Sequence, residues 1–420
     1  MSKNNENKLV PRLRFPEFRN EEGWEMKKVG EVIEESKVPS TSNNPHNRIT
    51  VRLNQKGVEK REVRGTEADN ATYFFIRRKG QFIYGKQNLH KGAFGLIPDE
   101  LDGFESSQDI PAFDFKNGYY PQYFVYYLGQ ENVYPDLEKI STGTGSKRIH
   151  PRDLFQVKFP FPKTEEQQKI AACLSSLDDV ITAESKKLEV LKEHKKGLLQ
   201  NLFPQEGETV PKLRFKEFED SGEWVFDAFS EYIKLYRGSS PRPIQNYFTT
   251  DESGANWIKI GDTKNADNFL IKQVEERITP EGAKKSRKVE VGELILANSM
   301  SFGKTYQLAI EGYIYDGWFV LREYEKQFDK EFLLQLLNSD YMQNQYKKLS
   351  TGGIVQNISS DIVYNTVLPH TSVYEQKRIA ACLSSLDEII SAQSQKIETL
   401  KLHKKGLLQG LFPDINEHNG

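Results

Sequence analysis

The chain has 420 residues, of which 37% are hydrophobic and 28% charged, and a formal net charge of −2. This length allows two to four domains with modest cores, and a near-neutral chain is not the strongly basic chain expected of a simple nucleic-acid binder. No stretch approaches 18 apolar residues and the first ten residues are mostly polar, so we expect a cytoplasmic protein without signal peptide or membrane contact. The two cysteines, Cys173 and Cys382, argue against a disulfide framework or a cysteine metal site.

Charge is unevenly distributed along the chain. Residues 48–91 hold 11 Lys and Arg against 4 Asp and Glu, whereas residues 92–138 hold one Lys against 9 Asp and Glu. Residues 277–304 are basic again, with 6 against 3. Such segregation allows a positive face on a neutral protein, and ordinary charged surface is an equally good explanation.

The chain opens with a short motif that returns in its second half. PRLRFPEF at 11–18 and Trp24 reappear as PKLRFKEF at 211–218 and Trp224. Each copy precedes a body of mixed strand and helix signals, at roughly 25–160 and 225–369. In the first body, residues 72–86 predict two strands around a turn at Lys79 and Gly80, and residues 120–128 predict a helix.

A long helix follows the first body. Its apolar residues alternate in spacings of four and three, which predicts a heptad seam. Thr164 and Gln167 have the spacing of a capping box at its start, and Pro204 ends it. The predicted seam consists of Ile170, Leu174, Leu177, Ile181, Leu188, Leu191, Leu198 and Leu202.

The second body resembles the first. Residues 288–299 repeat the strand–turn–strand pattern with Gly292 at the turn, and residues 329–341 repeat the helix. STGTGSKRI at 141–149 returns as STGGIVQNI at 350–358, at an offset of 209 residues. We therefore expect two bodies of related fold that differ in their tips, meaning the loops that carry the candidate contact residues named below.

The long helix then occurs a second time. Residues 375–413 match residues 166–204 without a gap, with 28 of 39 positions identical. Ser372 and Glu375 have capping-box spacing, and Pro413 ends the helix. The second seam consists of Ile379, Leu383, Leu386, Ile390, Ile397, Leu400, Leu407 and Leu411.

Both seams contain polar residues, which fix the register and orientation of paired helices. They are Glu184 and Lys195 in the first helix and Gln393 and Lys404 in the second. We predict that the two helices pair antiparallel and hold the bodies apart; the alternative is that each helix packs only on its own body. About 38 helical residues at about 1.5 Å each would make a spacer of about 57 Å, or at most about 17 base pairs of B-DNA.

The tips carry side chains suited to nucleic acid, since Arg and Lys suit guanine or phosphate and Asn and Gln suit adenine. Candidates in the first body are Arg77, Arg78, Lys86, Gln87, Asn88, His90, Lys91, Ser106, Ser107, Lys147 and Arg148. Candidates in the second are Arg237, Ser239, Ser240, Arg242, Asn298, Ser299, Ser301, Lys304, Thr305, Gln356 and Asn357. The same residue types occur in any exposed loop.

No pattern in the sequence predicts catalysis. The run Gly303-Lys304-Thr305 lacks the leading Gly of a phosphate-binding loop, because position 298 is Asn. Asp99, Asp114 and Lys116 loosely resemble a metal-dependent nuclease core without a second set of carboxylates. We find no Ser/His/Asp or Cys/His arrangement and no Gly-rich cofactor motif. The sequence therefore predicts a binding protein without a catalytic residue, metal or cofactor of its own.

The arrangement resembles the DNA-specificity subunit of type I restriction–modification systems. The resemblance covers nearly the whole chain and rests on the doubled Glu-Gln-x-x-Ile-Ala-x-x-Leu-x-x-Leu-Asp segment, at 166–178 and 375–387. It also rests on the Leu-Leu-Gln-x-Leu-Phe-Pro endings and the Arg-Phe-x-x-Phe openings followed by Trp. It implies an α/β fold with two mixed target-recognition domains separated by two long antiparallel coiled-coil helices, in a pseudo-two-fold internal repeat. The domains would be 1–163 and 205–371, the spacer helices 164–204 and 372–413, and the tail 414–420.

The resemblance also implies a function. Each target-recognition domain would read one half of a bipartite asymmetric sequence in double-stranded DNA. The helices would dock two methyltransferase subunits, which carry S-adenosylmethionine, while restriction subunits carry ATP-driven translocation with Mg. Residues that flank the seam could form the docking surface or pack on their own bodies: Ala171, Ala172, Cys173, Ala380, Ala381 and Cys382. The alternatives are a coiled-coil adaptor with two protein-binding heads and a nuclease built on Asp99, Asp114 and Lys116.

Overall fold

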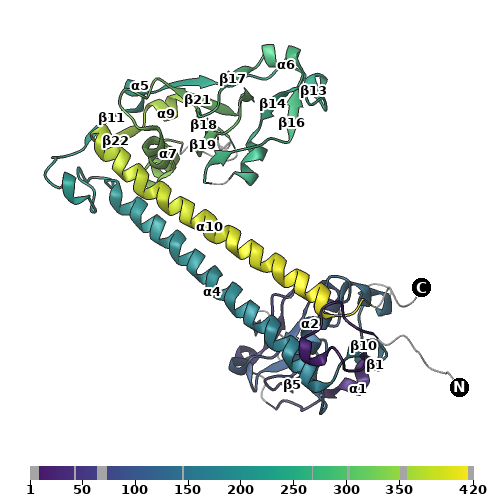
Figure 1. Cartoon of the computed structure of the whole chain (residues 1–420). Coiled ribbons are helices and arrows are strands. Elements are labelled where there is room, and N and C mark those ends of the chain that lie inside the picture. The colour runs from purple at the N-terminus through teal and green to yellow at the C-terminus, as the bar shows by residue number, and fades with distance from the viewer. Residues whose placement is uncertain are drawn as a thin grey trace. The chain divides into compact units, whose positions relative to one another are not determined.

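The computed structural model describes residues 9–41, 44–63, 73–143, 146–266, 268–299, 303–350 and 357–414 (Figure 1). The chain divides into a first unit, Met1–Ala183 with Glu398–Gly420, and a second unit, Glu184–Ile397. The long helices α4 (Thr164–Leu202) and α10 (Val373–Leu411) each contribute to both units. The prediction of a mixed α/β fold with two bodies and two long helices is therefore confirmed.

The first unit is built on a four-stranded antiparallel sheet in the order β2–β9–β6–β7. Helix α2 packs on this sheet, since the Phe124 ring lies 5.0 Å from the Phe82 ring of β6. Three further strand pairs are β1–β10, β3–β4 and β5–β8. The strands are β1 (Glu25–Lys28), β2 (Ile33–Ser36), β3 (Ile49–Val51), β4 (Val58–Lys60), β5 (Phe74–Ile76), β6 (Phe82–Tyr84), β7 (Phe94–Leu96), β8 (Glu105–Ser107), β9 (Ala112–Phe115) and β10 (Lys158–Phe161), and the short helices are α1 (Val29–Val32), α2 (Pro121–Leu128) and α3 (Pro151–Leu154).

The second unit contains two five-stranded sheets. Their orders are β12–β21–β18–β19–β15 and β13–β16–β14–β20–β17, and β11 pairs with β22. The strands are β11 (Val225–Ala228), β12 (Lys234–Arg237), β13 (Phe248–Thr249), β14 (Ala255–Ile258), β15 (Leu270–Ile271), β16 (Glu276–Ile278), β17 (Arg287–Val289), β18 (Leu294–Ala297), β19 (Thr305–Leu308), β20 (Gly312–Ile314), β21 (Trp318–Arg322) and β22 (Val367–His370). The helices are α5 (Phe229–Tyr232), α6 (Pro280–Lys284), α7 (Lys330–Asn338), α8 (Asp340–Leu349) and α9 (Ser360–Tyr364).

The two bodies each contain a sheet with the same strand order. The order β2–β9–β6–β7 in the first unit corresponds to β12–β21–β18–β19 in the second, and each neighbouring pair is antiparallel. Register agrees as well, because Phe82 and Leu294 occupy the same place beside Phe113 and Leu321. The prediction that the bodies are related is therefore confirmed by strand order and register.

Both predicted strand–turn–strand segments are present, but in neither do the two strands pair with each other. β5 and β6 flank a turn with Gly80 at φ +78°, and β5 pairs with β8 while β6 lies between β9 and β7. β17 and β18 flank Gly292 at φ +87°, and they belong to different sheets. A left-handed φ favours glycine, so each turn was readable in the sequence, whereas strand pairing depends on distant segments.

The repeated sequence motifs meet at the junction between each body and the helices. In the first unit, Arg14 of the opening motif forms a bidentate ion pair with Glu166 at the start of α4, with Nε–Oε1 and Nη2–Oε2 distances of 2.8 and 2.7 Å. In the second unit, Arg214 and Glu375 of α10 form the same pair at the same distances. All four side chains are at most 6% exposed. Arginine suits such a buried pair because its planar guanidinium matches a carboxylate with two hydrogen bonds.

Each junction also contains the end of the other long helix. Trp24 packs edge-on against Phe412, just beyond α10, and Trp224 packs in the same way against Phe203, just beyond α4; the ring centroids are 6.2 Å apart in both pairs. The backbone N–H of Leu13 donates to the carbonyl of Gly410, and that of Leu213 donates to the carbonyl of Asn201. Each body therefore holds the start of one helix and the end of the other.

Within each unit α4 and α10 lie side by side and run antiparallel (Figure 1). In the second unit Glu184 lies beside Gln393, and Lys195 binds Asp387 with Nζ–O distances of 2.6 and 2.8 Å. In the first unit Lys404 binds Asp178 at 2.6 Å. The polar seam residues thus have partners across the helix pair, and the helices are antiparallel, as predicted. Among the residues that the structure describes, no helix is both long and apolar enough to cross a bilayer.

The predicted alternative, that the helices pack on their own bodies, is also partly correct. The body cores contain Ile170 and Leu174 at the start of α4, and Ile379 and Leu383 at the start of α10. In the middle parts of the helices, Leu386, Ile390 and Ile397 of α10 are buried, whereas Leu177, Ile181, Leu188 and Leu191 of α4 are half-buried. The first residues of each helix therefore pack in the core of a body, and the middle parts of the two helices pack against each other.

The predicted capping boxes are wrong in part. Thr164 is the first residue of α4, and its hydroxyl donates to the carbonyl of Gly118 at 2.8 Å. At the second helix the Ser372 hydroxyl accepts a hydrogen bond from the backbone N–H of Glu375 at 3.3 Å, as a cap requires. The Glu375 carboxylate instead binds Arg214, because the buried guanidinium is a stronger partner than a backbone N–H.

Candidate nucleic-acid interface

Several predicted contact residues of the second body meet around one residue, Asp316. Its carbonyl accepts hydrogen bonds from Arg237 Nε at 3.2 Å and from Asn298 Nδ2 at 2.8 Å. Its carboxylate accepts one from the Ser240 hydroxyl at 3.1 Å and lies 3.7 Å from Arg242 Nη2. Asp316 thus connects the ends of β12 and β18, which are far apart in the sequence.

A pocket of about 380 Å³ opens beside this cluster. Arg237, Asn298 and Asn357 line it, together with Ser359 and Ser360. The backbone N–H of Ile358 donates to the carbonyl of Asn298 at 2.7 Å and so fixes the 357–360 segment beside β18. The structure therefore brings three of the predicted residues to one polar hollow, and two of them are amides.

Asp316 is not among the predicted residues, because those are donors suited to bases and phosphates and Asp316 is an acceptor. Its signal was the Tyr-Asp-Gly run at 315–317, which is typical of a turn. Gly317 supplies the carbonyl that accepts from the backbone N–H of Asn298 at 3.0 Å. The turn before β21 is therefore the element that positions the tip.

The first body has the same backbone arrangement with different side chains. The backbone N–H of Ile149 donates to the carbonyl of Lys86 at 2.8 Å, which matches the contact between Ile358 and Asn298. The side chains at the two matched positions are Lys86 and Arg148 in the first body and Asn298 and Asn357 in the second. A cationic pair in one body therefore takes the place of an amide pair in the other.

The cations of the first tip lie beside carboxylates. Arg148 Nη2 lies 3.4 Å from Asp109 Oδ2, and Lys147 Nζ lies 3.0 Å from Glu138 Oε1, which lowers the pKa of the Glu138 carboxyl. Both pairs are solvent-exposed, so they are weak and the cations can exchange partners. Gln87, Lys91 and Arg78 are also exposed, whereas Lys86, Asn88 and His90 are half-buried.

Two predicted contacts of the first body are corrected by their burial. Arg77 is 1% exposed, and its guanidinium donates to the Ser106 hydroxyl at 2.7 Å and to the Ser36 carbonyl at 2.8 Å. Burial lowers the pKa of Arg77 to about 10. Ser106 is likewise 1% exposed and donates to the carbonyl of Ile110. Both residues therefore hold the body together and present no donor outward; Ser107 beside them is half-buried.

Predicted contacts around β19 of the second body differ in accessibility. Thr305 is fully buried and so is corrected to an interior residue. Burial is the main cause that lowers the pKa of Lys304, which lies 6.0 Å from the Phe269 ring. The Ser239 hydroxyl donates to the carbonyl of Lys285, and Ser299 is half-buried. Ser301 and Gln356 lie outside the described residues.

The structure does not gather the three residues of the nuclease alternative. Asp99 lies 3.3 Å from Lys79, Asp114 accepts from Gln81 at 2.9 Å, and Lys116 donates to the carbonyl of Gly30 at 2.8 Å. In the described ranges, no group of three or more His, Cys, Asp or Glu is placed to hold a metal ion. A shared metal-dependent site at Asp99, Asp114 and Lys116 thus finds no geometric support.

The residues beside the helix seam divide into two kinds. Ala171 and Ala380 are at most 4% exposed and belong to the cores of the first and second bodies, so they cannot offer a docking surface. Ala172 and Ala381 are exposed, and Cys173 and Cys382 are half-buried free thiols. The docking surface at the exposed residues Ala172 and Ala381 stays a prediction.

Comparisons with known proteins identify the family of this chain. The model of the family described as the type I restriction modification DNA specificity domain matches residues 21–193 and 227–402. The chain is 26% identical over 291 residues to the type I restriction enzyme MjaVIII specificity subunit of Methanocaldococcus jannaschii. That match spans 66% of this chain and 66% of the relative, so the chain spans about two thirds of its length.

Two solved structures have a similar fold. The first is a chain of a type I R-M system described for its complex assembly and conformational transition, with a TM-score of 0.59, 18% identity, and 96% of this chain and 99% of that chain covered. The second is the type I restriction-modification system S subunit from M. genitalium, with a TM-score of 0.57, 14% identity, and 97% and 100% covered. At these identities the likeness concerns the fold.

Proposed function

This chain belongs to the family of type I restriction–modification DNA specificity subunits, and on that premise we propose that it is the non-catalytic subunit that selects a DNA sequence in such a system. Each body reads one half of a bipartite, asymmetric double-stranded site. The paired helices set the length of the unread stretch between the halves.

One observation carries this proposal. Two bodies of one sheet order present different hydrogen-bonding side chains at the same backbone positions, Lys86 and Arg148 in one and Asn298 and Asn357 in the other. A cationic pair suits guanine or phosphate, and an amide pair suits adenine. One scaffold with two different tips is what reading an asymmetric sequence requires.

The partners follow from the same role. Two methyltransferase subunits dock on the outward faces of the helices, beside Ala172 and Ala381, and restriction subunits join that complex. S-adenosylmethionine, ATP and Mg belong to those subunits, and this chain supplies no catalytic group. Its contribution to the reaction is to hold the DNA at a chosen sequence, which raises the local concentration of one target base at the partner's active site.

Mapping methylated sites genome-wide tests the proposal. Cells should carry this chain with its methyltransferase partner, and then a chimera whose residues 25–160 come from another family member. We expect one half-site to change and the other to stay, because each body has its own core and its own candidate contact residues. Loss or change of both halves would contradict the modular assignment.

The length of the unread stretch has its own test. One heptad added to both helices at equivalent positions keeps the seam in phase and lengthens the pair by about 10.5 Å, or about 3 base pairs. We expect the mapped gap to grow while both half-sites stay the same. An unchanged gap with intact methylation would show that the helices do not set it.

A coiled-coil adaptor with two protein-binding heads is the competing function. It predicts weak and sequence-independent association with DNA, whereas a subunit that contacts many phosphates shows affinity that falls steeply with salt. Binding of the purified chain to duplex DNA across a salt series separates the two.

A further inference from the structure

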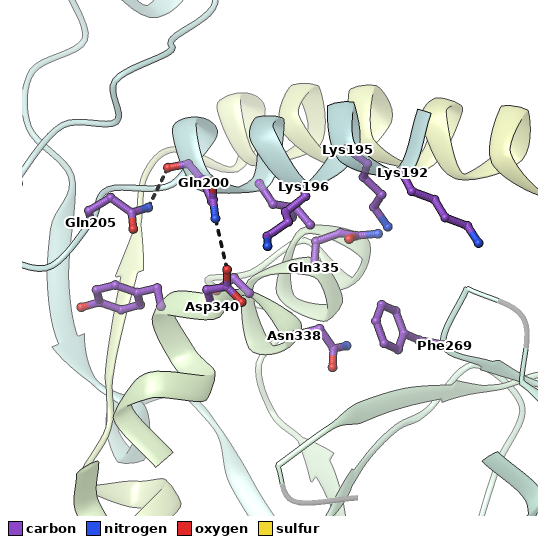
Figure 2. Close-up of a pocket in the computed structure, with 12 residues that line it drawn as sticks. Lys192, Lys195, Lys196, Gln200, Gln205, Phe269, Gln335, Asn338 and Asp340 are labelled. Carbon is purple, nitrogen blue, oxygen red and sulfur yellow. Dashed lines mark hydrogen bonds between the residues drawn. The ribbon is translucent and has the colours of Figure 1, made fainter. Parts of the chain in front are cut away.

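A second pocket, of about 180 Å³, lies in the second unit between α4, α7 and the loop that leads into β15. Lys192, Lys195 and Lys196 line it from α4, and Phe269, Gln335 and Asp340 line it from the body. Figure 2 shows Lys195 extending from α4 toward Gln335 and Phe269, with Lys192 and Lys196 on either side of it. The spacing of three and four residues places them on one helix face.

Only one of the three lysines has its charge compensated in place. Lys195 binds both oxygens of Asp387. Lys192 and Lys196 form no ion pair among the residues that the structure describes, and both are exposed. Lys304, which like Lys195 lies about 6 Å from the Phe269 ring, adds a third cation nearby. The cations around the pocket therefore outnumber its carboxylates, Asp340 and Asp387.

The first unit has the same helix face with the charges paired. The repeat equivalents of Lys192, Lys195 and Lys196 are Lys401, Lys404 and Lys405. Lys401 lies 2.7 Å from Glu398, Lys404 lies 2.6 Å from Asp178, and Lys405 lies 2.7 Å from Glu131. The sequence of the helix is thus nearly constant, whereas its electrostatic surroundings are not.

Two substitutions between the bodies accompany the differences at Lys195 and Lys196, whereas Lys192 has the same neighbour, Glu189, that Lys401 has in Glu398. Tyr126, whose hydroxyl donates to Asp178 at 2.8 Å, is replaced by Gln335, whose amide donates to Asp387 at 3.0 Å. Lys404 lies 5.2 Å from the Tyr126 ring, whereas Lys195 lies 5.9 Å from the ring of Phe269. Glu131 is replaced by Asp340, which is one methylene shorter and accepts from Gln200 at 3.3 Å. Lys196 therefore lacks the carboxylate that Lys405 has.

From these contacts we infer that the pocket binds a phosphate group of the DNA backbone, an inference that rests on the proposed function. Lys192 and Lys196 supply the two charges, and the Gln200 amide, one N–H of which donates to Asp340, supplies a neutral donor at the edge of the pocket. The volume of about 180 Å³ is large enough for a hydrated phosphate group. It is smaller than the roughly 300 Å³ or more of a typical site for a whole small molecule such as a nucleotide. The contact is independent of sequence and occurs on the second unit alone.

A salt series with matched variants tests this contact. The full chain carrying Lys192→Gln with Lys196→Gln is compared with Lys401→Gln with Lys405→Gln, using a long fluorescent duplex of mixed sequence. For the first pair we expect the slope of log affinity against log salt to fall by about 2, and affinity at ~0.1 M salt to fall on the order of tenfold or more. For the second pair we expect no change in slope.

A third variant closes the pocket without removing a lysine. Asp340→Glu restores the reach of Glu131 and should pair Lys196, which lowers the slope by about 1. Because the three changes lie on exposed side chains, each variant should keep the wild-type unfolding temperature. Equal slopes in all variants, or an equal loss from both lysine pairs, would overturn the assignment.

Inorganic pyrophosphate distinguishes the sources of phosphate. Its binding to the DNA-free chain, followed by calorimetry, should be weakened by Lys192→Gln with Lys196→Gln and not by the control pair. If pyrophosphate binding falls and the DNA slope does not, the DNA source is overturned in favour of a free phosphate ligand. If the DNA slope stays and only co-purification with the methyltransferase falls, the pocket is a protein contact and the inference fails. Absence of any duplex binding by the wild type would instead refute the proposed function.

Discussion

The two body–helix junctions are nearly identical, and the two tips are not. Arg14 with Glu166 and Arg214 with Glu375 repeat the same bidentate geometry, and Trp24 and Trp224 repeat the same ring contact. At the tips the same backbone hydrogen bond carries different side chains. A junction residue cannot be substituted without its partner, because a buried charge that lacks its partner is far more unfavourable than an altered exposed side chain. The tips are free of this constraint.

The largest expected effect lies at the junctions. Arg14→Ala leaves Glu166 buried without a partner and should lower the free energy of unfolding by about 3–5 kcal/mol. Arg214→Ala should have a somewhat smaller effect in the second unit, because the Thr371 hydroxyl still donates to Glu375 at 2.6 Å; urea unfolding with probes in each unit measures both. The exposed pair of Arg378 with Glu217 provides the control, and Arg378→Ala should change stability by less than about 1 kcal/mol. A loss of less than about 1 kcal/mol from either buried arginine would show that its ion pair does not stabilise the junction.

The tips should respond in sequence preference. Asn357→Ala should weaken discrimination at one position of the second half-site by about 1–3 kcal/mol and leave the first half-site unchanged. Lys86→Ala should do the converse. Binding competition among duplexes with single changes in each half of the mapped site measures both, and a variant that affects both halves equally would contradict separate reading.

A smaller effect should separate the two ion pairs of the helix seam. The Lys195 and Asp387 side chains are 13% and 9% exposed, whereas those of Lys404 and Asp178 are 24% and 39% exposed. Asp387→Ala should therefore lower stability by about 2 kcal/mol and Asp178→Ala by about 1 kcal/mol or less. Equal losses of unfolding free energy for the two variants would show that this difference in burial does not affect the strength of the ion pairs.

The smallest expected effect is a pH dependence confined to the second unit. Hydrogen bonds from Tyr232, and then from His370, lower the pKa of the Asp227 carboxyl below its usual 3.8. The position equivalent to Asp227 in β1 is Lys27. Because the pKa is lower in the folded state, the stabilisation is present above pH 3.8 and is lost as pH falls through the lower folded value.

Asp227→Asn should therefore be less stable than the wild type at neutral pH, and the two should converge in acid. Urea midpoints of both proteins, measured from neutral pH to below pH 3.8, check the sign. A difference that stays constant across that range would mean that Asp227 acts through packing and not through its charge.

Much of the site was readable in the sequence and some of it was not. The offset of 209 residues aligned Arg148 with Asn357, and the structure confirms that alignment through equivalent backbone hydrogen bonds. Residue type alone did not distinguish Arg77 from Arg78. Both follow β5 directly, yet Arg77 is buried and Arg78 is exposed. Asp316 was missed because it positions other residues as an acceptor.

The sequence by itself determined that one module occurs twice, where its long helices begin and end to within two residues, and that polar residues interrupt their seam. Those features are local or periodic, so they are visible without any knowledge of distant contacts. The tertiary structure alone decided which strands pair, that each body holds the end of the other's helix, and that identical lysines are paired in one unit and open in the other. Each of these depends on side chains brought together across more than a hundred residues, where a change such as Glu131 to Asp340 alters reach by one methylene and leaves no mark on the pattern.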